Sequence, residues 1–555
     1  MKKVLLLISF ILTSVVCFAQ TPDWAWANGS GGAAYDCSSS VTTDAFGNVY
    51  IAGYFTSPSI SFGNDTLFNI NNGYGQNRQA FFAKFDANGI ALWARIGIST
   101  MYANASSIAV DHSGNVYVTG DFKNTITFNS TVTLQDIHPG WGDIFVVKYN
   151  SSGQLLWAKR YGGTASELSN SIAIDTSDNL YLAGNFNSDT IRFGSTVLTN
   201  AQTGSIDMFL TKLDTSGNVI WARSAGGTNN DDARSVAVDP WNNVFITGYE
   251  TSPSISFDSY TFVNTGSFLV KYNTNGLVIW ADLIVGTGMD MANSVAIDAL
   301  GNSYIAGQFE SKHLYFEFTT LTNPREGVDD IFIVKTDPDG NFLWANRAGG
   351  MGFDEAFSIA VDALGNSYIV GFFGSDTICF GSNILTTTTT GYWDIFIAKY
   401  STNGNNLWAR NAAGTKDDIA YSVAVNDPAD IYVTGEFRSP YITFNNDYVY
   451  NHSYVTDLFL AKIASGNFII SLNNSSSITL SPNPFSQSTL ISFGKTYSSL
   501  ALEVFNLQGQ MLEREEYRNC YEIVFQRNQL SPGMYFIKLT LDGKIVETRK
   551  EIVGD

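Results

Sequence analysis

A segment of about 64 residues recurs seven times along this chain, and no other feature limits the possible folds as strongly. Each copy runs from a Trp-Ala pair through an apolar pentad, such as Ser171-Ile-Ala-Ile-Asp175, to the patterns N-x-Y-x-x-G-x-F, I-x-F and D-x-F-x-x-K. A period of this size with several short alternating strands is typical of propellers and solenoids. The copies begin at Trp26, Trp93, Trp157, Trp221, Trp280, Trp344 and Trp408.

Each copy predicts four strands and one additional hairpin. In the third copy we expect strands at Trp157–Tyr161, Ser171–Asp175, Leu180–Phe186 and Asp207–Lys212, because these short segments are β-branched or aromatic and are bounded by turn-forming residues. The extra hairpin is expected at residues 191–198, between the third and fourth of these segments. The pentad has a small central residue, so we expect it to be the innermost strand, where space around an axis is limited.

The ring is expected to close by joining the two ends of the repeat region. The chain after Lys462 has no Trp strand, whereas Trp26 precedes the first set of strands without a partner. The Trp26 strand is therefore predicted to be the outer strand of the last blade, which leaves no blade incomplete. The predicted fold is all-β: a seven-bladed β-propeller over residues 24–463, a linker over 464–477 and a small antiparallel β-sandwich over 478–555.

Composition and the N-terminus indicate an exported protein. The formal net charge of −20 argues against a nucleic-acid partner, because the protein surface and a phosphate backbone would repel each other. Residues 1–19 have two lysines, an apolar run and small residues, the pattern of a signal peptide, with cleavage expected after Ala19. No later stretch is long and apolar enough to predict a transmembrane helix. A monomer is expected.

Two resemblances follow from these motifs. The order S-[IV]-A-[VI]-D, G-N-x-Y, G-x-F, D-x-F-x-x-K, W-A resembles the bacterial SBBP repeat, which implies a seven-bladed propeller. The tail is similar to the C-terminal sorting domain of the type IX secretion system, which implies recognition by that machinery at the outer membrane and release or attachment at the cell surface. The residues that carry this second resemblance are Pro482, Asn483, Pro484, Gly509, Gly533, Tyr535 and Lys550.

The strongest candidate for a metal site is a carboxylate four positions before the pentad Ser. Equivalent positions of a propeller lie on one circle, and oxygen ligands suit Ca²⁺, so a calcium site at the channel mouth is one interpretation. The other is that each carboxylate caps a loop of its own blade. Ala103 holds this position in the second copy, and the remaining six copies have Asp36, Glu167, Asp231, Asp290, Asp354 and Asp418.

A lysine and a tryptophan also recur in every copy. Each lysine is expected to end its strand and pair with a nearby Asp, such as the Asp of D-x-F-x-x-K, although a ring of lysines would also suit an anionic glycan. The tryptophans are expected to pack between blades, and sugar stacking is the alternative. The lysines are Lys84, Lys148, Lys212, Lys271, Lys335, Lys399 and Lys462.

Signatures of catalysis are weak, and no catalytic residue is assigned. The four histidines fall at unrelated positions of the repeat, and the chain has no H-E-x-x-H, G-x-S-x-G or phosphate-binding loop. The favoured function is therefore a non-enzymatic propeller, secreted or on the cell surface, that binds a protein or a glycan. One alternative is a secreted carbohydrate-active enzyme, a hydrolase or lyase, with its site at the channel mouth. The other is a purely structural envelope protein.

Overall fold

The fold is that of a computed structural model, which describes residues 22–70, 77–263, 265–426, 430–445, 447–453, 455–463, 479–481, 487–505, 511–527, 530, 533–541 and 544–553. Every helix or strand in these ranges is a β-strand, which confirms the all-β prediction. The chain divides into two compact units, Met1–Ser465 and Gly466–Asp555. Ala19 and the predicted linker lie outside the described residues.

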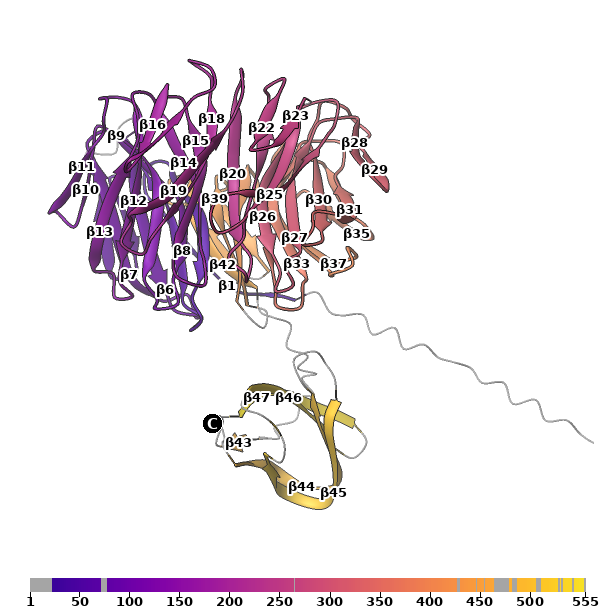
Figure 1. The fold of residues 1–555 in the computed structure, drawn as a ribbon. Helices are drawn as coiled ribbons and strands as arrows, with labels where there is room; N and C mark the ends of the chain where they lie inside the picture. Colours follow the sequence, from indigo (N-terminus) through magenta and orange to yellow (C-terminus); the bar gives the residue numbers. More distant parts are fainter. Residues whose placement is uncertain are drawn as a thin grey trace, which may run out of the picture. The chain divides into compact units, whose positions relative to one another are not determined.

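The described residues of the first unit form seven antiparallel sets of four strands, which stand side by side as blades in Figure 1. This number is consistent with the seven-bladed propeller that the repeats predict. The first strands are β2 (Asp36–Thr43), β8 (Tyr102–Val110), β14 (Glu167–Ile174), β20 (Asp231–Val238), β26 (Asp290–Ile297), β32 (Asp354–Val361) and β38 (Asp418–Asn426). The second strands are β3 (Val49–Phe55), β9 (Val116–Lys123), β15 (Leu180–Phe186), β21 (Val244–Glu250), β27 (Ser303–Phe309), β33 (Ser367–Phe373) and β39 (Asp430–Phe437).

The third and fourth strands complete each blade. The third strands are β6 (Gln79–Phe85), β12 (Gly142–Tyr149), β18 (Asp207–Leu213), β24 (Gly266–Tyr272), β30 (Asp330–Thr336), β36 (Asp394–Tyr400) and β42 (Asp457–Ile463). The fourth strands are β7 (Ala91–Ser99), β13 (Leu155–Tyr161), β19 (Val219–Ala225), β25 (Val278–Ile284), β31 (Phe342–Ala348), β37 (Asn406–Ala412) and β1 (Trp24–Ser30).

The first strands of the blades contact one another in a closed cycle, so they are the innermost strands, as predicted from the pentad. A ring of hydrogen bonds follows this cycle. The first Ser of each pentad accepts a hydrogen bond from the N–H of the second pentad residue in the next blade, at 3.1 to 3.3 Å. The Ser and N–H pairs are Ser40 with Ile108, Ser107 with Ile172, Ser171 with Val236, Ser235 with Val295, Ser294 with Ile359, Ser358 with Val423, and Ser422 with Val41.

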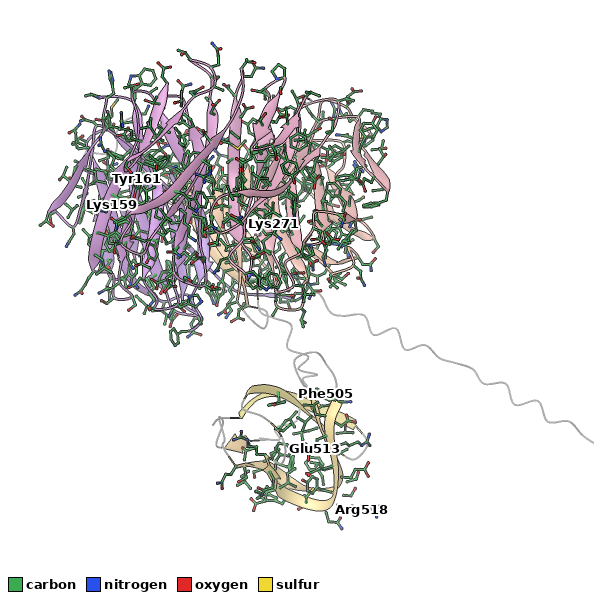
Figure 2. All side chains as sticks on the ribbon, viewed as in Figure 1. Lys159, Tyr161, Lys271, Phe505, Glu513 and Arg518 are labelled. Atoms are coloured by element: carbon green, nitrogen blue, oxygen red, sulfur yellow. The ribbon has the colours of Figure 1, made fainter. Side chains whose placement is uncertain are left out.

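The last blade is completed from the N-terminus. Strand β1 pairs antiparallel with β42, with Trp26 opposite Lys462, so the prediction that the Trp26 strand closes the ring is confirmed. Figure 2 shows the side chains on the blades, and clusters of buried apolar side chains join neighbouring blades. One such cluster joins Tyr304 and Ile333 of one blade to Phe396 of the next.

The two faces of the propeller differ in the connections between strands that lie on them. The turns from the first to the second strand and from the third to the fourth lie on one face, which we call the turn face. The pentad Asp stabilises the first of these turns: Asp111 accepts hydrogen bonds from the N–H groups of Ser113 and Asn115 at 3.0 and 2.8 Å. Gly114 has a positive φ of 77°, which explains the Gly of the Gly-Asn pair.

The additional hairpin predicted just before the D-x-F-x-x-K segment is present in each blade, where it connects the second strand to the third. Their strands are β4 (Ser59–Phe62) and β5 (Asp65–Phe68), β10 (Thr125–Phe128) and β11 (Val132–Gln135), β16 (Thr190–Phe193) and β17 (Thr196–Thr199), β22 (Ile255–Phe257) and β23 (Tyr260–Phe262), β28 (His313–Phe316) and β29 (Thr319–Thr322), β34 (Thr377–Phe380) and β35 (Asn383–Thr386), and β40 (Tyr441–Phe444) and β41 (Asp447–Tyr450). In the second blade β10 also pairs with β7 of the preceding blade.

The second unit is a five-stranded antiparallel sheet of β43 (Thr479–Ser481), β44 (Ser488–Phe505), β45 (Met511–Gln526), β46 (Gly533–Leu541) and β47 (Lys544–Val553). The long β44 pairs with β43, β45 and β46, and its register shifts between Ser492 and Tyr497. Ile491 and Leu502, on either side of this shift, belong to one buried cluster. The two layers expected for a sandwich are thus parts of one hydrogen-bonded sheet.

Replacing a serine of the central ring is expected to destabilise the propeller. In Ser235→Ala the buried N–H of Val295 loses its acceptor, which should lower the free energy of unfolding by about 1–3 kcal/mol. Urea denaturation followed by Trp fluorescence measures this change. The exposed Ser256→Ala, which removes a hydroxyl from a surface hairpin, is the control and should change the stability little. Equal effects of the two substitutions would contradict the role of the ring.

Candidate binding face

The six carboxylates predicted as a metal site lie at the first position of six innermost strands and are almost fully buried. Each accepts a hydrogen bond from a Ser hydroxyl in the connection that follows the second strand of its own blade. In the sixth blade, Asp354 accepts from Ser375 Oγ at 2.7 Å and from the Gly350 N–H at 2.8 Å. The other acceptor and Ser pairs are Asp36 with Ser57, Glu167 with Ser188, Asp231 with Ser252, Asp290 with Ser311, and Asp418 with Ser439.

This geometry supports the capping interpretation. Each carboxylate satisfies donors of its own blade and lies within a separate sheet. In the described part of the chain, no three His, Cys, Asp or Glu side chains are grouped so as to hold a metal ion. Calcium binding therefore stays a prediction that no described ligand set supports.

Burial changes the acidity of these caps. It raises the pKa of Asp354 from 3.8 to about 7, although the hydrogen bonds from Ser375 and Gly350 oppose this shift. Burial likewise raises the pKa of Glu167 to about 8 and that of Asp290 to about 6. Burial therefore favours the protonated form of these carboxyls in the folded chain.

Each repeat lysine pairs with an Asp, as predicted, but the example given, the Asp of D-x-F-x-x-K, was wrong. Lys148 lies opposite Tyr117 in the β12–β9 register, and the Tyr117 hydroxyl donates to Asp111, which ends the pentad. Lys148 Nζ is therefore 3.8 Å from Asp111, whereas Asp143 of D-x-F-x-x-K lies toward the other end of β12 and accepts from the Ile137 N–H. The equivalent pairs are Lys84 with Asp44, Lys212 with Asp175, Lys271 with Asp239, Lys335 with Asp298, and Lys399 with Asp362. In the seventh blade, where the pentad ends in Asn426, Lys462 pairs with Asp430 at the start of β39.

The lysine and the tryptophan of one blade together bind a carbonyl of the next. Lys84 Nζ and Trp93 Nε1 both donate to the Ser151 carbonyl, at 3.4 and 3.2 Å. Lys462 and Trp26 converge in the same way on the Ala87 carbonyl, across the closing seam. These contacts support packing between blades as the role of both residues, and they leave neither set as a free ring for sugars or anions.

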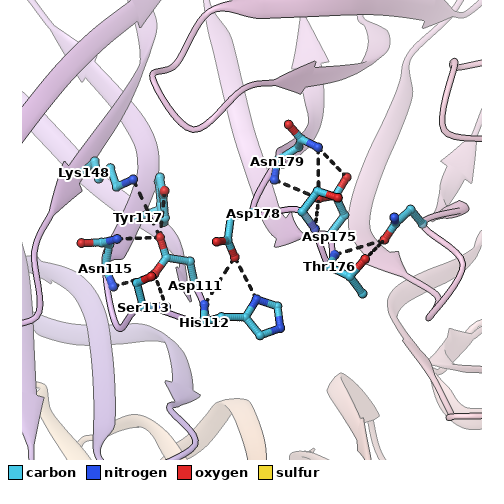
Figure 3. Close-up of polar contacts among 12 residues, drawn as sticks. Asp111, His112, Ser113, Asn115, Tyr117, Lys148, Asp175, Thr176, Asp178 and Asn179 are labelled. Atoms are coloured by element: carbon cyan, nitrogen blue, oxygen red, sulfur yellow. Dashed lines mark hydrogen bonds and ion pairs between the residues drawn. The ribbon is translucent and has the colours of Figure 1, made fainter.

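Further contacts connect neighbouring turns on the turn face. The His112 ring lies 2.8 Å from Asp178 of the next blade (Figure 3), and the Thr176 hydroxyl donates to Asn242 at 2.8 Å. A shallow depression of about 330 Å³ lies here, lined by residues such as Asp175 and Pro240. Most of its lining belongs to the repeated turns, in which the pentad Asp recurs and the residue after it differs from blade to blade.

The opposite face is different. There, a β-bulge interrupts each innermost strand just before the pentad Ser, and the second strand ends nearby. The residue types at these positions differ from blade to blade, and we call this set of residues the rim. The bulge residues of the rim are Ser39, Ser106, Asn170, Arg234, Asn293, Phe357 and Tyr421. Its second-strand residues are Tyr54, Asp121, Asn185, Tyr249, Gln308, Phe372 and Glu436. The innermost-strand residues paired with these second-strand residues also belong to the rim, and they are Cys37, Asn104, Leu168, Asp232, Met291, Glu355 and Ile419.

Rim side chains contact one another from blade to blade. Asp232 accepts hydrogen bonds from Asn170 and Asn185 of the preceding blade at 2.8 and 2.6 Å, and it pairs with Arg234 at 2.9 Å. The Arg234 guanidinium lies over the ring of Tyr249, 5.2 Å from its centroid. One part of the rim is therefore a charged and hydrogen-bonded network.

A second part of the rim is acidic and lies between the last and first blades. Glu436 is hydrogen-bonded to Cys37 and Tyr421, and burial raises its pKa. Arg78 lies 3.9 Å from the centroid of the Tyr54 ring, beside this group. The Arg78 guanidinium and the Glu436 carboxyl thus lie near each other between the last and first blades.

The third part is aromatic and centres on the sixth blade. Phe357 contacts both Phe372 and Tyr421, with ring centroids 5.8 and 5.4 Å apart. Trp393 stacks on Phe372 at 4.4 Å with an interplanar angle of 21°. Phe353 and Trp393 are 47% and 36% exposed, so apolar surface at this site is open to a partner.

Sequence reasoning did not identify the rim, although a signal for it was present. The x of G-x-F and the residue before the pentad Ser vary, while their neighbours repeat. The repeated residues identify the strands and turns of the propeller. The positions at which the copies differ would have identified the rim.

Removing one buried cap is expected to weaken the pH dependence of stability. The folded chain holds protons on these carboxyls at pH values where the unfolded chain has lost them, so stability falls as the pH rises from about 4 to about 7. Asp354→Asn has no ionisable group at this position and should show a smaller decline. Thermal midpoints between pH 5 and 8 test this, with the exposed Asp376→Asn as the control for lost charge. Parallel curves for wild type and Asp354→Asn would show that the cap does not titrate.

The tail of the chain matches the family model described as "Secretion system C-terminal sorting domain" over residues 479–554. Residues 479–554 are a sorting domain of this family. Strand β46 of the sorting domain begins at Gly533 and holds Tyr535, and Lys550 lies on β47. The remaining motif residues Pro482, Asn483, Pro484 and Gly509 lie outside the described residues.

The sorting domain directs the protein through the type IX secretion system to the cell surface or the extracellular space. Within the described residues, no helix has the length and apolar character needed to cross a membrane. The location predicted from the sequence is confirmed.

Curated and solved proteins are similar to this chain. A WD repeat-containing protein of Acanthamoeba polyphaga mimivirus is 26% identical over 506 residues, which cover 76% of this chain and 36% of that protein. The chain thus spans about a third of the length of this relative. The Pan2 WD40 domain of Neurospora crassa (8% identity, TM-score 0.37, 80% of this chain and 98% of that chain) and Sqt1 of Chaetomium thermophilum (10% identity, TM-score 0.39, 80% and 100%) are similar solved structures.

Deleting residues 479–554 is expected to retain the protein in the periplasm, because the outer-membrane step requires the sorting domain. Immunoblots of periplasmic, surface and medium fractions from a host with type IX secretion measure this. A deletion of the same size made in a second exported protein of that host, one without a sorting domain, controls for general effects. Normal external levels of the truncated propeller would contradict the role of the domain.

Proposed function

We propose that this protein is a secreted or surface-attached binding module whose rim face holds a protein partner. The contrast between the two faces is the observation that carries the proposal. On the turn face the pentad Asp accepts the same backbone hydrogen bonds in six blades, as a structural role requires, although the two residues after this Asp differ between blades. The rim varies in every blade and presents charged, amide and aromatic groups side by side.

The composition of the rim favours a protein partner. Aromatic, Met and Arg side chains are enriched at the centres of protein interfaces. Phe353 and Trp393 supply exposed aromatic surface, and Met351, two residues before Phe353 in the sequence, is 64% exposed. The Arg and carboxyl groups at the closing seam supply polar contacts that orient a partner.

Three further features belong to the same proposal. The leader is cleaved after Ala19, the repeats are of the SBBP type that their motif order resembles, and the mature protein acts as a monomer. The leader and the sorting domain support passage across both membranes. The separate, internally bonded caps support a propeller that needs no metal to hold its partner.

The proposal is tested by comparing substitutions on the two faces. Phe353→Ser combined with Trp393→Ala removes exposed apolar surface from the rim face, and Trp241→Ala combined with Leu300→Ala does the same on the turn face. Each full-length protein is immobilised and exposed to the extracellular and outer-membrane proteins of its host. We expect a partner that the wild type and the turn-face variant retain and that the rim variant loses by at least about tenfold.

Two outcomes would count against the rim. Loss of binding only in the turn-face variant would place the site on the other face. Release of new reducing ends or unsaturated sugars from polysaccharides by the wild type would favour the alternative, a carbohydrate-active enzyme. Thermal midpoints of both variants serve as the check that the fold is intact.

A further inference from the structure

The hairpin of the seventh blade carries a cluster of exposed aromatic residues that is separate from the rim. Tyr441, Tyr448 and Tyr450 are 39%, 55% and 67% exposed and lie on the outer side of β40 and β41. Their ring centroids are 5.4 to 6.4 Å apart, and the rings of Tyr448 and Tyr450 are inclined by only 27°. We call these three side chains the tyrosine platform.

The six equivalent hairpins show that the fold does not need these tyrosines. Cross-strand pairs place Tyr441 opposite Tyr450, and Thr443 opposite Tyr448. The pair equivalent to Tyr441 and Tyr450 is Thr190 with Thr199 in the third blade and Thr377 with Thr386 in the sixth. At the position of Tyr448 the other hairpins have Thr66, Thr133, Val197, Thr261, Thr320 and Ile384.

The inner side of the hairpin that carries the platform is packed against the propeller. Ile442, Phe444 and Val449 on the inner side of the hairpin are buried. Phe444 packs edge to face against Trp24 at 4.8 Å, and the Thr443 N–H donates to the Ala413 carbonyl of the preceding blade at 3.0 Å. Because the hairpin is already ordered, a ligand that binds the rings does not have to order it.

We propose that the tyrosine platform binds a neutral polysaccharide chain. The C–H faces of sugar rings pack on flat aromatic rings, and phenol hydroxyls exchange hydrogen bonds with sugar hydroxyls. The three side chains of the platform carry no cation, and the exposed Asp447 precedes Tyr448 on β41, so an anionic glycan is disfavoured. The sorting domain delivers the chain to the cell surface or beyond, where such polymers are accessible.

The size of the platform favours a glycan over a protein. A stable protein interface covers about 800 Å² on each partner, more than one hairpin with four-residue strands presents. A few sugar rings need no more than the rings provide. The site is therefore distinct from the protein-binding rim and does not depend on it.

The test uses isothermal titration of the purified full chain with cellohexaose, xylohexaose, laminarihexaose and mannohexaose. We expect at least one to bind, Tyr448→Thr to weaken that binding about tenfold, and the triple variant Tyr441→Thr, Tyr448→Thr, Tyr450→Thr to bring it below detection. Phe68→Thr, at the position of Tyr450 in the first blade, is the matched control and should bind like the wild type. Threonine occurs at these positions in other hairpins, so the triple variant is expected to fold.

Three results would overturn the proposal. They are the absence of binding by all four hexasaccharides, unchanged binding by the triple variant, and a wild-type dimer that the triple variant converts to a monomer without any sugar binding. The last would assign the platform to a second copy of the chain. A failure of the rim experiment leaves these outcomes unaffected, because the rim substitutions lie elsewhere.

Discussion

The structure depends on the hydrogen bond between the first Ser of one pentad and the backbone N–H of the next. Seven such bonds form a closed ring, and the bond from Val41 to Ser422 joins the first blade to the last. Since each bond links two blades, the blade spacing at the axis is set at every step. The small pentad centre and the bulge that precedes the Ser then follow, because they let the innermost strands approach so closely.

Outside this ring, charged residues of the repeat form contacts within each blade and between neighbouring blades. Lys148, for example, contacts Asp111 of its own blade and donates to the Thr215 carbonyl of the next. A charge buried in this way is destabilising without its partner, so these residues are constrained to repeat. The rim residues lie beyond the ring at one face and are free of this constraint. A uniform frame and a varied surface thus come from one repeated unit.

Much of this frame could be predicted from the sequence, and the reasons are physical. Alternation of branched and polar residues indicated the strands, and the unpaired Trp26 indicated the closure of the ring. The lysine pairing could not be predicted, because Asp143 and Asp111 are both close in sequence and only the register between β9 and β12 distinguishes them. The bulges and the rim were missed for a similar reason: they arise from backbone geometry at positions where the residue type is not fixed. The tyrosine platform follows the hairpin pattern, and its exposure became clear only with the pairing.

The pairing of β1 with β42, which closes the ring, has a mechanical consequence. Trp24 at the start of β1 lies opposite Ile463 at the end of β42, so both ends of the propeller chain leave from the same point of one antiparallel pair. Tension applied between the leader side and the tail side acts on these hydrogen bonds one after another, as in a zipper, and does not load them all at once. The propeller therefore opens first at this pair under force, while the other six blades keep all four strands.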